Sequence, residues 1–206
     1  MTDAAAPTLV VEWGSVGVPL EGDRSGDAPV VAPFPHGTLV AAIDGLGHGP
    51  EAADAAEAAA RVLAAFAGEE LASLVERCHE ALRRTRGVAL TLASFDARTS
   101  LMTWAAVGNV EGFLVRADPA ARPARESVLQ RGGVVGYQLP PLRVVALRVA
   151  PGDTLVLATD GIRSGFVADL AATTRPRALA QSILERHARG SDDALVVVAR
   201  YVGASP

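Results

Sequence analysis

Gly87 divides the sequence into two parts with different hydrophobic patterns. Before it, Pro50 is a favourable first residue for an alanine-rich helix over residues 50–67, and Gly68 is a favourable residue to end it. Residues 69–86 repeat apolar side chains at three- and four-residue spacing, which predicts a second helix. After Gly87 come short apolar runs separated by turn residues, which predict strands.

The predicted elements do not alternate regularly between strand and helix. Strands are expected at residues 8–13, 36–43, 88–95, 101–107, 111–115, 128–130, 143–149, 154–158 and 194–201, a third helix at 176–189, and loops at 14–35 and 117–127. One strand, two helices, a run of antiparallel strands, one helix and a last strand are typical of an α+β fold, in which helices cover antiparallel sheets.

Length and composition narrow the class of protein. The 206 residues suit a single domain spanning 1–206, of which we expect 1–7 to be flexible, and a 50% hydrophobic content excludes a disordered chain. No apolar run approaches the roughly 20 residues of a membrane span, and the first residues do not form a signal peptide. A net charge of −4 argues against nucleic acid as a partner, and the single cysteine, Cys78, is typical of a cytoplasmic protein.

Four acidic positions share one placement, at the start or end of an apolar strand: Asp27, Asp44, Asp160 and the pair Asp192-Asp193. A carboxylate beside an apolar run is costly to desolvate without a partner, and the chain contains no lysine. Divalent cations would satisfy several carboxylates together, and oxygen ligands favour Mg²⁺ or Mn²⁺ over zinc. A simpler interpretation stays open, because Asp-Gly at residues 44–45 and 160–161 is also a common turn dipeptide.

Four sequence runs together resemble a known enzyme family. They are SGD from Ser25, IDGLGHGPEAA from Ile43, ATDGI from Ala158 and SDDALVVV from Ser191. In this order they are similar to the metal-dependent protein phosphatases (PPM, type 2C-like), and specifically to their bacterial SpoIIE/RsbX-like branch. The resemblance extends from about residue 22 to residue 201.

The resemblance implies an αββα sandwich, two packed antiparallel sheets flanked by helices, with two Mn²⁺ or Mg²⁺ ions at one edge. Asp44 would bridge the ions, with the Gly45 carbonyl helping to hold one. Asp160 and Asp192 would complete the ligands of one ion, and Asp27 would serve the other directly or through water. The ions would activate a water molecule for in-line attack on phosphorus.

Three further residues are candidates, each with a structural alternative. His48 could protonate the leaving serine or threonine oxygen, or only pack within its glycine-rich turn. Asn109, the sole asparagine, lies in a Gly-Asn-Val run that the family places near the site, although asparagine also favours turns. Arg24 could bind phosphate in place of the arginine that eukaryotic relatives use, or be a solvated loop residue.

The resemblance therefore implies a cytoplasmic serine/threonine protein phosphatase. Its expected substrate is a phosphorylated STAS-domain regulator of a stress or partner-switching pathway, and neither nucleic acid nor membrane is an expected partner. Two alternatives remain: a non-catalytic PPM-like interaction module, and a phosphohydrolase acting on a small phosphorylated molecule. The sequence leaves the oligomeric state open.

Overall fold

The computed structural model describes residues 9–170, 172 and 174–203. The segment 1–7, for which we expected flexibility, lies outside the described residues. The elements follow one another along the chain as β1 (Val11–Val18), β2 (Asp27–Phe34), β3 (Gly37–Gly45), α1 (Pro50–Ala65), α2 (Leu71–Leu82), β4 (Val88–Asp96), β5 (Leu101–Val107), β6 (Glu111–Val115), β7 (Arg125–Ser127), β8 (Val145–Arg148), β9 (Thr154–Ala158), the 3₁₀ helix η1 (Ser164–Asp169), α3 (Pro176–His187) and β10 (Ala194–Tyr201).

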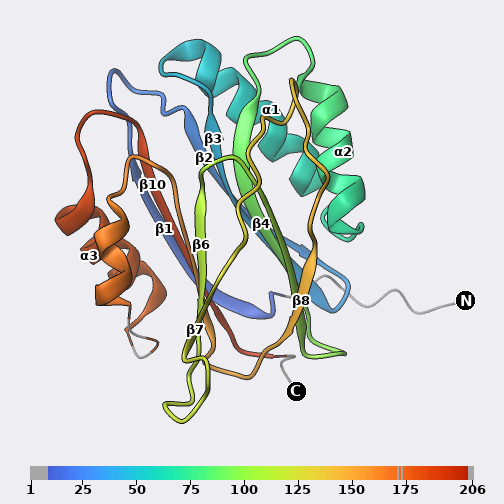
Figure 1. The fold of residues 1–206 in the computed structure, drawn as a ribbon, viewed down its shortest axis with the longest axis vertical. Coiled ribbons are helices and arrows are strands. Elements are labelled where there is room, and N and C mark those ends of the chain that lie inside the picture. Colours follow the sequence, from blue (N-terminus) through green and yellow to red (C-terminus); the bar gives the residue numbers. More distant parts are fainter. Residues whose placement is uncertain (1–8, 171, 173, 204–206) are drawn as a thin grey trace, which may run out of the picture.

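Two antiparallel sheets pack face to face. One has the strand order β1-β10-β9-β6-β7 and the other β2-β3-β4-β5-β8. Helices α1 and α2 cover the outer face of the second sheet, and α3 covers the outer face of the first (Figure 1). The four layers confirm the predicted αββα sandwich and position β2, β3, β9 and β10 so that strand ends from both sheets meet.

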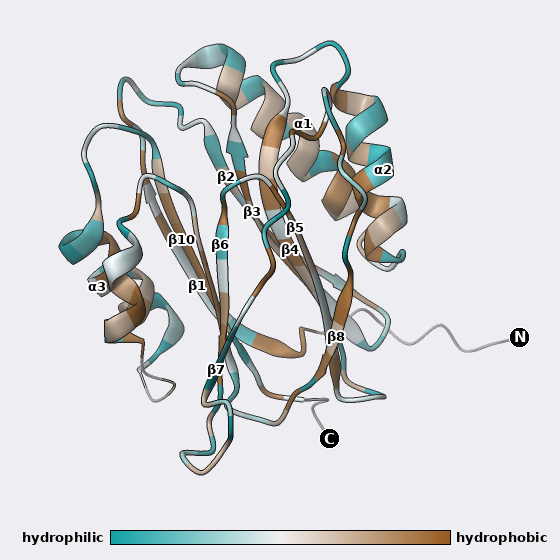
Figure 2. Ribbon diagram, in the orientation of Figure 1, coloured by the Kyte–Doolittle hydropathy of each residue, from teal (hydrophilic) through white to brown (hydrophobic). Residues whose placement is uncertain are grey.

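The central strands are buried on both faces, and this explains their uninterrupted apolar sequences. In β3, Leu39 and Ile43 pack beneath the helices while Val40 packs between the sheets. In β10, Val197 packs between the sheets while Val196 faces α3. Apolar colour accordingly runs along the inner strands, whereas polar colour gathers in the loops at the ends (Figure 2).

Strand β2 corrects the prediction of a loop over residues 14–35. Pro29 and Pro33 made this segment resemble a loop, because proline cannot donate a hydrogen bond to a neighbouring strand. β2 is an edge strand that pairs only with β3, so a proline whose nitrogen faces the open edge removes no hydrogen bond from the sheet. Strand β1 also continues to Val18, paired with β10 over its whole length.

Three other boundaries differ from the prediction. The strand expected at 128–130 lies instead at Arg125–Ser127, within the expected loop. This short polar segment pairs with β6 at the edge of the sheet. Helix α2 ends at Leu82 rather than Arg86, where the amide and hydroxyl of Thr85 both donate to the Leu82 carbonyl. Helix α3 ends at His187, because Ala188 pairs with Ile162.

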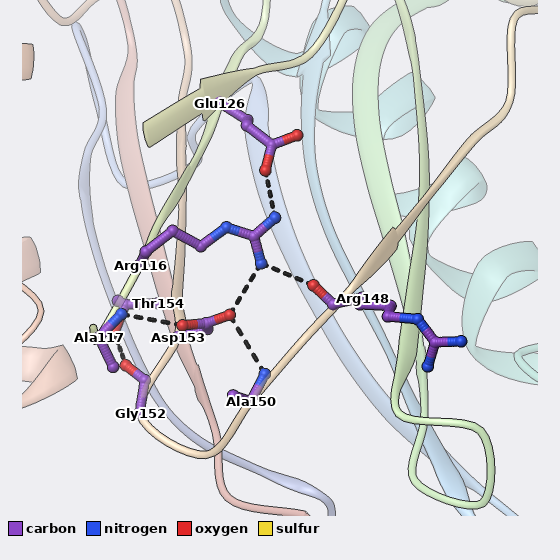
Figure 3. Close-up of polar contacts among 8 residues, drawn as sticks. All are labelled: Arg116, Ala117, Glu126, Arg148, Ala150, Gly152, Asp153 and Thr154. Carbon is purple, nitrogen blue, oxygen red and sulfur yellow. Dashed lines mark hydrogen bonds and ion pairs between the residues drawn. The ribbon is translucent and has the colours of Figure 1, made fainter. Parts of the chain in front are cut away.

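An ion-pair network closes the end of the sandwich where β9 begins. Arg116 pairs with Asp153 at 2.9 Å and with Glu126, and it donates to the Arg148 carbonyl at 2.6 Å (Figure 3). Asp153 also accepts from the backbone amides of Ala117 and Ala150. Because Asp153 precedes β9 and Asp160 follows it, this network stabilises the end opposite to the acidic candidates.

Candidate functional site

The topology brings the four predicted carboxylates to one end of the sandwich. Asp27 starts β2 and Asp44 lies near the end of β3, and the two residues are direct partners across this antiparallel pair. Asp160 follows β9 and Asp192 precedes β10, its antiparallel neighbour. Directly paired residues project from the same face of a sheet, so Asp27 and Asp44 lie side by side facing the other two.

Burial raises the pKa values of Asp27 and Asp44. Desolvation, with smaller contributions from the neighbouring carboxylates, raises the pKa of Asp44 to about 8. The pKa of Asp27 is raised to about 7 by the same burial, although a hydrogen bond from Thr159 opposes the rise. At pH 7, without a compensating cation, Asp44 is therefore mostly protonated and Asp27 about half protonated.

Asp160 is tied to Asn109, the sole asparagine. The Asn109 side-chain amide donates to Asp160 Oδ2 at 2.7 Å. Burial and the charge of Asp192 raise the pKa of Asp160, while Arg189 and this hydrogen bond lower it. The structure thus places Asn109 beside the acidic candidates, where it orients one of them.

Two residues hold the site together in roles that the sequence did not predict, Thr159 and the second aspartate of the Asp192-Asp193 pair. Thr159 donates to Asp27 Oδ2 at 2.7 Å and accepts from the Leu195 amide at 2.8 Å, so it links the two sheets at the cluster. Buried Asp193 accepts from the amides of Leu20 at 2.7 Å and Gly26 at 2.8 Å. Their positions directly before Asp160 and after Asp192 are the only sequence signal for these roles.

The two Asp-Gly pairs allow close approach of the backbone. A Cβ atom on Gly45 would lie 2.2 Å from the Ala52 carbonyl oxygen, and one on Gly161 would lie 1.9 Å from the Asp193 carbonyl oxygen. The glycines therefore let α1 and the β10 loop lie against the strand ends that carry the acidic residues. The turn interpretation and the site interpretation of these dipeptides are compatible.

His48 and Arg24 lie outside the hydrogen-bonded cluster. His48 is exposed in the turn between β3 and α1, and its ring makes no hydrogen bond to another residue that the structure describes. Arg24 pairs with Asp54 at 2.7 Å and Glu57 at 2.8 Å, both on α1. Its guanidinium is thus paired on the protein surface, as the alternative of a solvated loop residue expects, and phosphate binding by Arg24 stays a prediction.

The donor set fits a hard divalent cation, although the side chains are not arranged around one. Carboxylates and a backbone carbonyl are the oxygen ligands that Mg²⁺ and Mn²⁺ prefer. Within the described ranges, no three Asp, Glu, His or Cys side chains surround a point that could hold an ion. Asp27, Asp160 and Asp192 accept hydrogen bonds from Thr159, Asn109 and a backbone amide, and these bonds leave other oxygen lone pairs for an ion.

The fold is that of the protein phosphatases of the PPM, type 2C-like, kind. A chain from the bacterial stressosome, described as a modular system adapted to control secondary messenger signaling, is 31% identical with a TM-score of 0.83, covering 92% of this chain and 99% of that one. RsbX in complex with magnesium shares the fold at 20% identity and a TM-score of 0.79, covering 92% and 94%.

The chain belongs to the SpoIIE family, described as Stage II sporulation protein E, whose profile matches residues 35–202. Phosphoserine phosphatase RsbX of Bacillus subtilis (strain 168) is 30% identical over 76 residues, which are 37% of this chain and 38% of RsbX. The match thus spans less than half the length of that curated relative. These findings confirm the resemblance and the fold class inferred from the motifs.

No helix in the described part of the chain has the length and apolar character needed to cross a membrane.

Proposed function

We propose that this protein is a Mn²⁺- or Mg²⁺-dependent phosphoserine/phosphothreonine protein phosphatase. The observation that carries the proposal is the meeting of Asp27, Asp44, Asp160 and Asp192 at one end of the sandwich, where burial raises the pKa values of Asp27, Asp44 and Asp160. Such a cluster is costly to keep without function, and perturbed carboxyl pKa values are typical of functional sites.

The four carboxylates, with the Gly45 carbonyl, would hold two ions. When bound, these supply an activated water molecule and neutralise charge on the phosphoryl oxygens. Asn109 keeps Asp160 oriented, and Thr159 does the same for Asp27. The phosphorus–oxygen bond to the serine or threonine breaks as the bond from phosphorus to the water oxygen forms. His48, exposed at the rim, would donate a proton to the leaving oxygen.

The proposed substrate is a phosphorylated STAS-domain regulator in a stress or partner-switching pathway. Similarity to a stressosome chain over nearly the whole length of both chains supports this pathway. Similarity to a phosphoserine phosphatase supports phosphoserine as the residue that is dephosphorylated. We also propose a cytoplasmic location. It is supported by cysteine usage, because the sequence has a single cysteine, Cys78, which is a free thiol, and therefore no internal disulfide framework.

Phosphate release from a phosphoserine-containing STAS protein, with Mn²⁺ and then with excess EDTA, tests this function. Asp44→Asn should lower the Mn²⁺-dependent rate by at least about 100-fold, because it removes the central carboxylate. Asp54→Asn is the matched control, since it makes the same charge change on the exposed surface of α1 and should stay within about twofold.

Two outcomes would contradict the proposal. If the unsubstituted protein released phosphate in Mn²⁺ no faster than the Asp44→Asn variant, a non-catalytic interaction module would be supported instead. A kcat/KM for small sugar or nucleoside phosphates exceeding that for the phosphoprotein would show that the substrate is a small molecule.

A further inference from the structure

Arg189 is held beside the acidic cluster by its own backbone. It lies in the short loop between α3 and Asp192, and its amide donates to the Gly161 carbonyl at 2.8 Å. The preceding residue, Ala188, pairs with Ile162 across the same two segments. These contacts fix the start of the Arg189 side chain next to Asp160, one residue before Gly161.

The guanidinium of Arg189 is exposed and has no carboxylate partner in an ion pair within the part of the chain that the structure describes. Its backbone is tied to Gly161, the residue that follows Asp160. Two other arginines near this end are engaged, Arg24 with Asp54 and Glu57, and Arg86 with Glu51. Arg189 is thus a cation at the rim of the cluster that remains available to a ligand.

A phosphoryl group entering this end of the sandwich needs such a cation. Its non-reacting oxygens carry negative charge and would approach several carboxylates, which repel them. Ions held by the carboxylates would neutralise the inner oxygens, while the outer oxygens face the rim. A planar guanidinium binds two phosphoryl oxygens together and keeps its charge at every relevant pH.

We propose that Arg189 binds the outer phosphoryl oxygens of the phosphoprotein substrate, in the role that the sequence suggested for Arg24. This inference rests on the proposed phosphatase function. It makes Arg189 a substrate-binding residue that holds the phosphoryl group at the site, and it assigns to Arg189 no part in holding the ions.

Arg189→Gln and Arg189→Lys test the proposal with two readouts. For Arg189→Gln, we expect the KM for a phosphoserine peptide and the Ki of inorganic phosphate each to rise by about 10-fold or more, because a charge-assisted bidentate contact is lost. Arg189→Lys should fall in between, since an ammonium keeps the charge but loses the fork geometry. Mn²⁺ affinity, measured by calorimetry, should stay within about twofold.

Arg186→Gln is the matched control. It makes the same change three residues earlier, on a side chain that is exposed and paired with Asp169 at 3.3 Å. KM and Ki should change by no more than about twofold in this variant.

Two results would overturn the assignment. One is an Arg189→Gln protein with unchanged KM and unchanged phosphate inhibition. The other is a loss of Mn²⁺ affinity that accounts for the kinetic change, which would mean that Arg189 acts on Asp160 rather than on substrate. If the unsubstituted protein released no phosphate with Mn²⁺, the proposed function would fail, and calorimetric binding of inorganic phosphate to the Mn²⁺-loaded variants would still decide the role of Arg189.

Discussion

At the scale of single residues, the site is a set of carboxylates whose hydrogen-bond partners decide how each is used. The Asp193 carboxylate accepts hydrogen bonds from two backbone amides and has a structural role. Among the described residues, its neighbour Asp192 accepts a hydrogen bond only from the Asp193 amide. Asp27 and Asp160 each have one side-chain donor, Thr159 and Asn109. A single donor orients a carboxylate yet leaves its other oxygen lone pairs for a ligand.

Asn109 therefore offers a test of residue-scale positioning. Removing its amide in Asn109→Ala should weaken Mn²⁺ binding by about 10-fold, because Asp160 loses the partner that fixes its orientation. Calorimetric titration measures this affinity. Ser164→Ala is the control, since Ser164 donates to a different carboxylate, that of Glu111. Equal Mn²⁺ affinities for the two variants would show that Asn109 does not position Asp160.

The sequence predicted the four carboxylates from their places at strand ends, and Asn109 from being the sole asparagine in a run that resembles a family motif. It could not show which group donates to which. Thr159 looked like an ordinary strand residue, and only packing of the two sheets brings its hydroxyl to Asp27. Arg24 lay near Asp27 in sequence, but α1 presents Asp54 and Glu57 to it. Contacts across the sequence, rather than residue types, decided both outcomes.

At the scale of elements, the acidic end depends on strands whose ends meet and on turns that fit tightly between them. The β2–β3 register places Asp27 opposite Asp44, and the pairing of β9 with β10 brings Asp160 toward Asp192. Central strands such as β3 were predicted from their apolar runs. Edge strand β2 was not, because its prolines are tolerated only at an edge, which the sequence alone does not reveal.

Gly161 tests the importance of that close fit. Gly161→Ala forces a methyl group against the Asp193 carbonyl, so we expect about 1–3 kcal/mol lower stability in denaturant unfolding and weaker Mn²⁺ binding. Gly132→Ala is a suitable control, because a Cβ there meets no atom within 4 Å and its φ is not in the left-handed region. If both variants unfold at the same denaturant concentration, the turn does not require glycine.

At the scale of the whole molecule, the two ends of the sandwich serve different purposes. At one end, Arg116 forms ion pairs with both Asp153 and Glu126 (Figure 3). At the other, four carboxylates gather, and Arg189 is the cation in the described part of the chain that lowers the pKa of Asp160. The carboxylates of the first end are thus paired within the protein, whereas those of the other can be neutralised by protons or by divalent cations.

This asymmetry predicts how stability depends on pH. An unfolded aspartate has a pKa of about 3.9, whereas Asp27 and Asp44 titrate at about 7 and 8 in the folded protein. Between about pH 4 and pH 8 the folded state therefore binds more protons than the unfolded state, and stability without metal falls as pH rises through this range. Cations compete with these protons, so they should stabilise the protein more at pH 8 than at pH 5.

The most direct test of the central claim, that these carboxylates form a cation site, is the thermal unfolding midpoint with and without Mn²⁺ at pH 5 and pH 8. The metal-free midpoint should be lower at pH 8. Mn²⁺ at about 100 times its Kd should then raise it by about 5–10 °C, with a smaller rise at pH 5 and little response in Asp44→Asn. An unsubstituted protein whose midpoint does not respond to Mn²⁺ at either pH would contradict the claim.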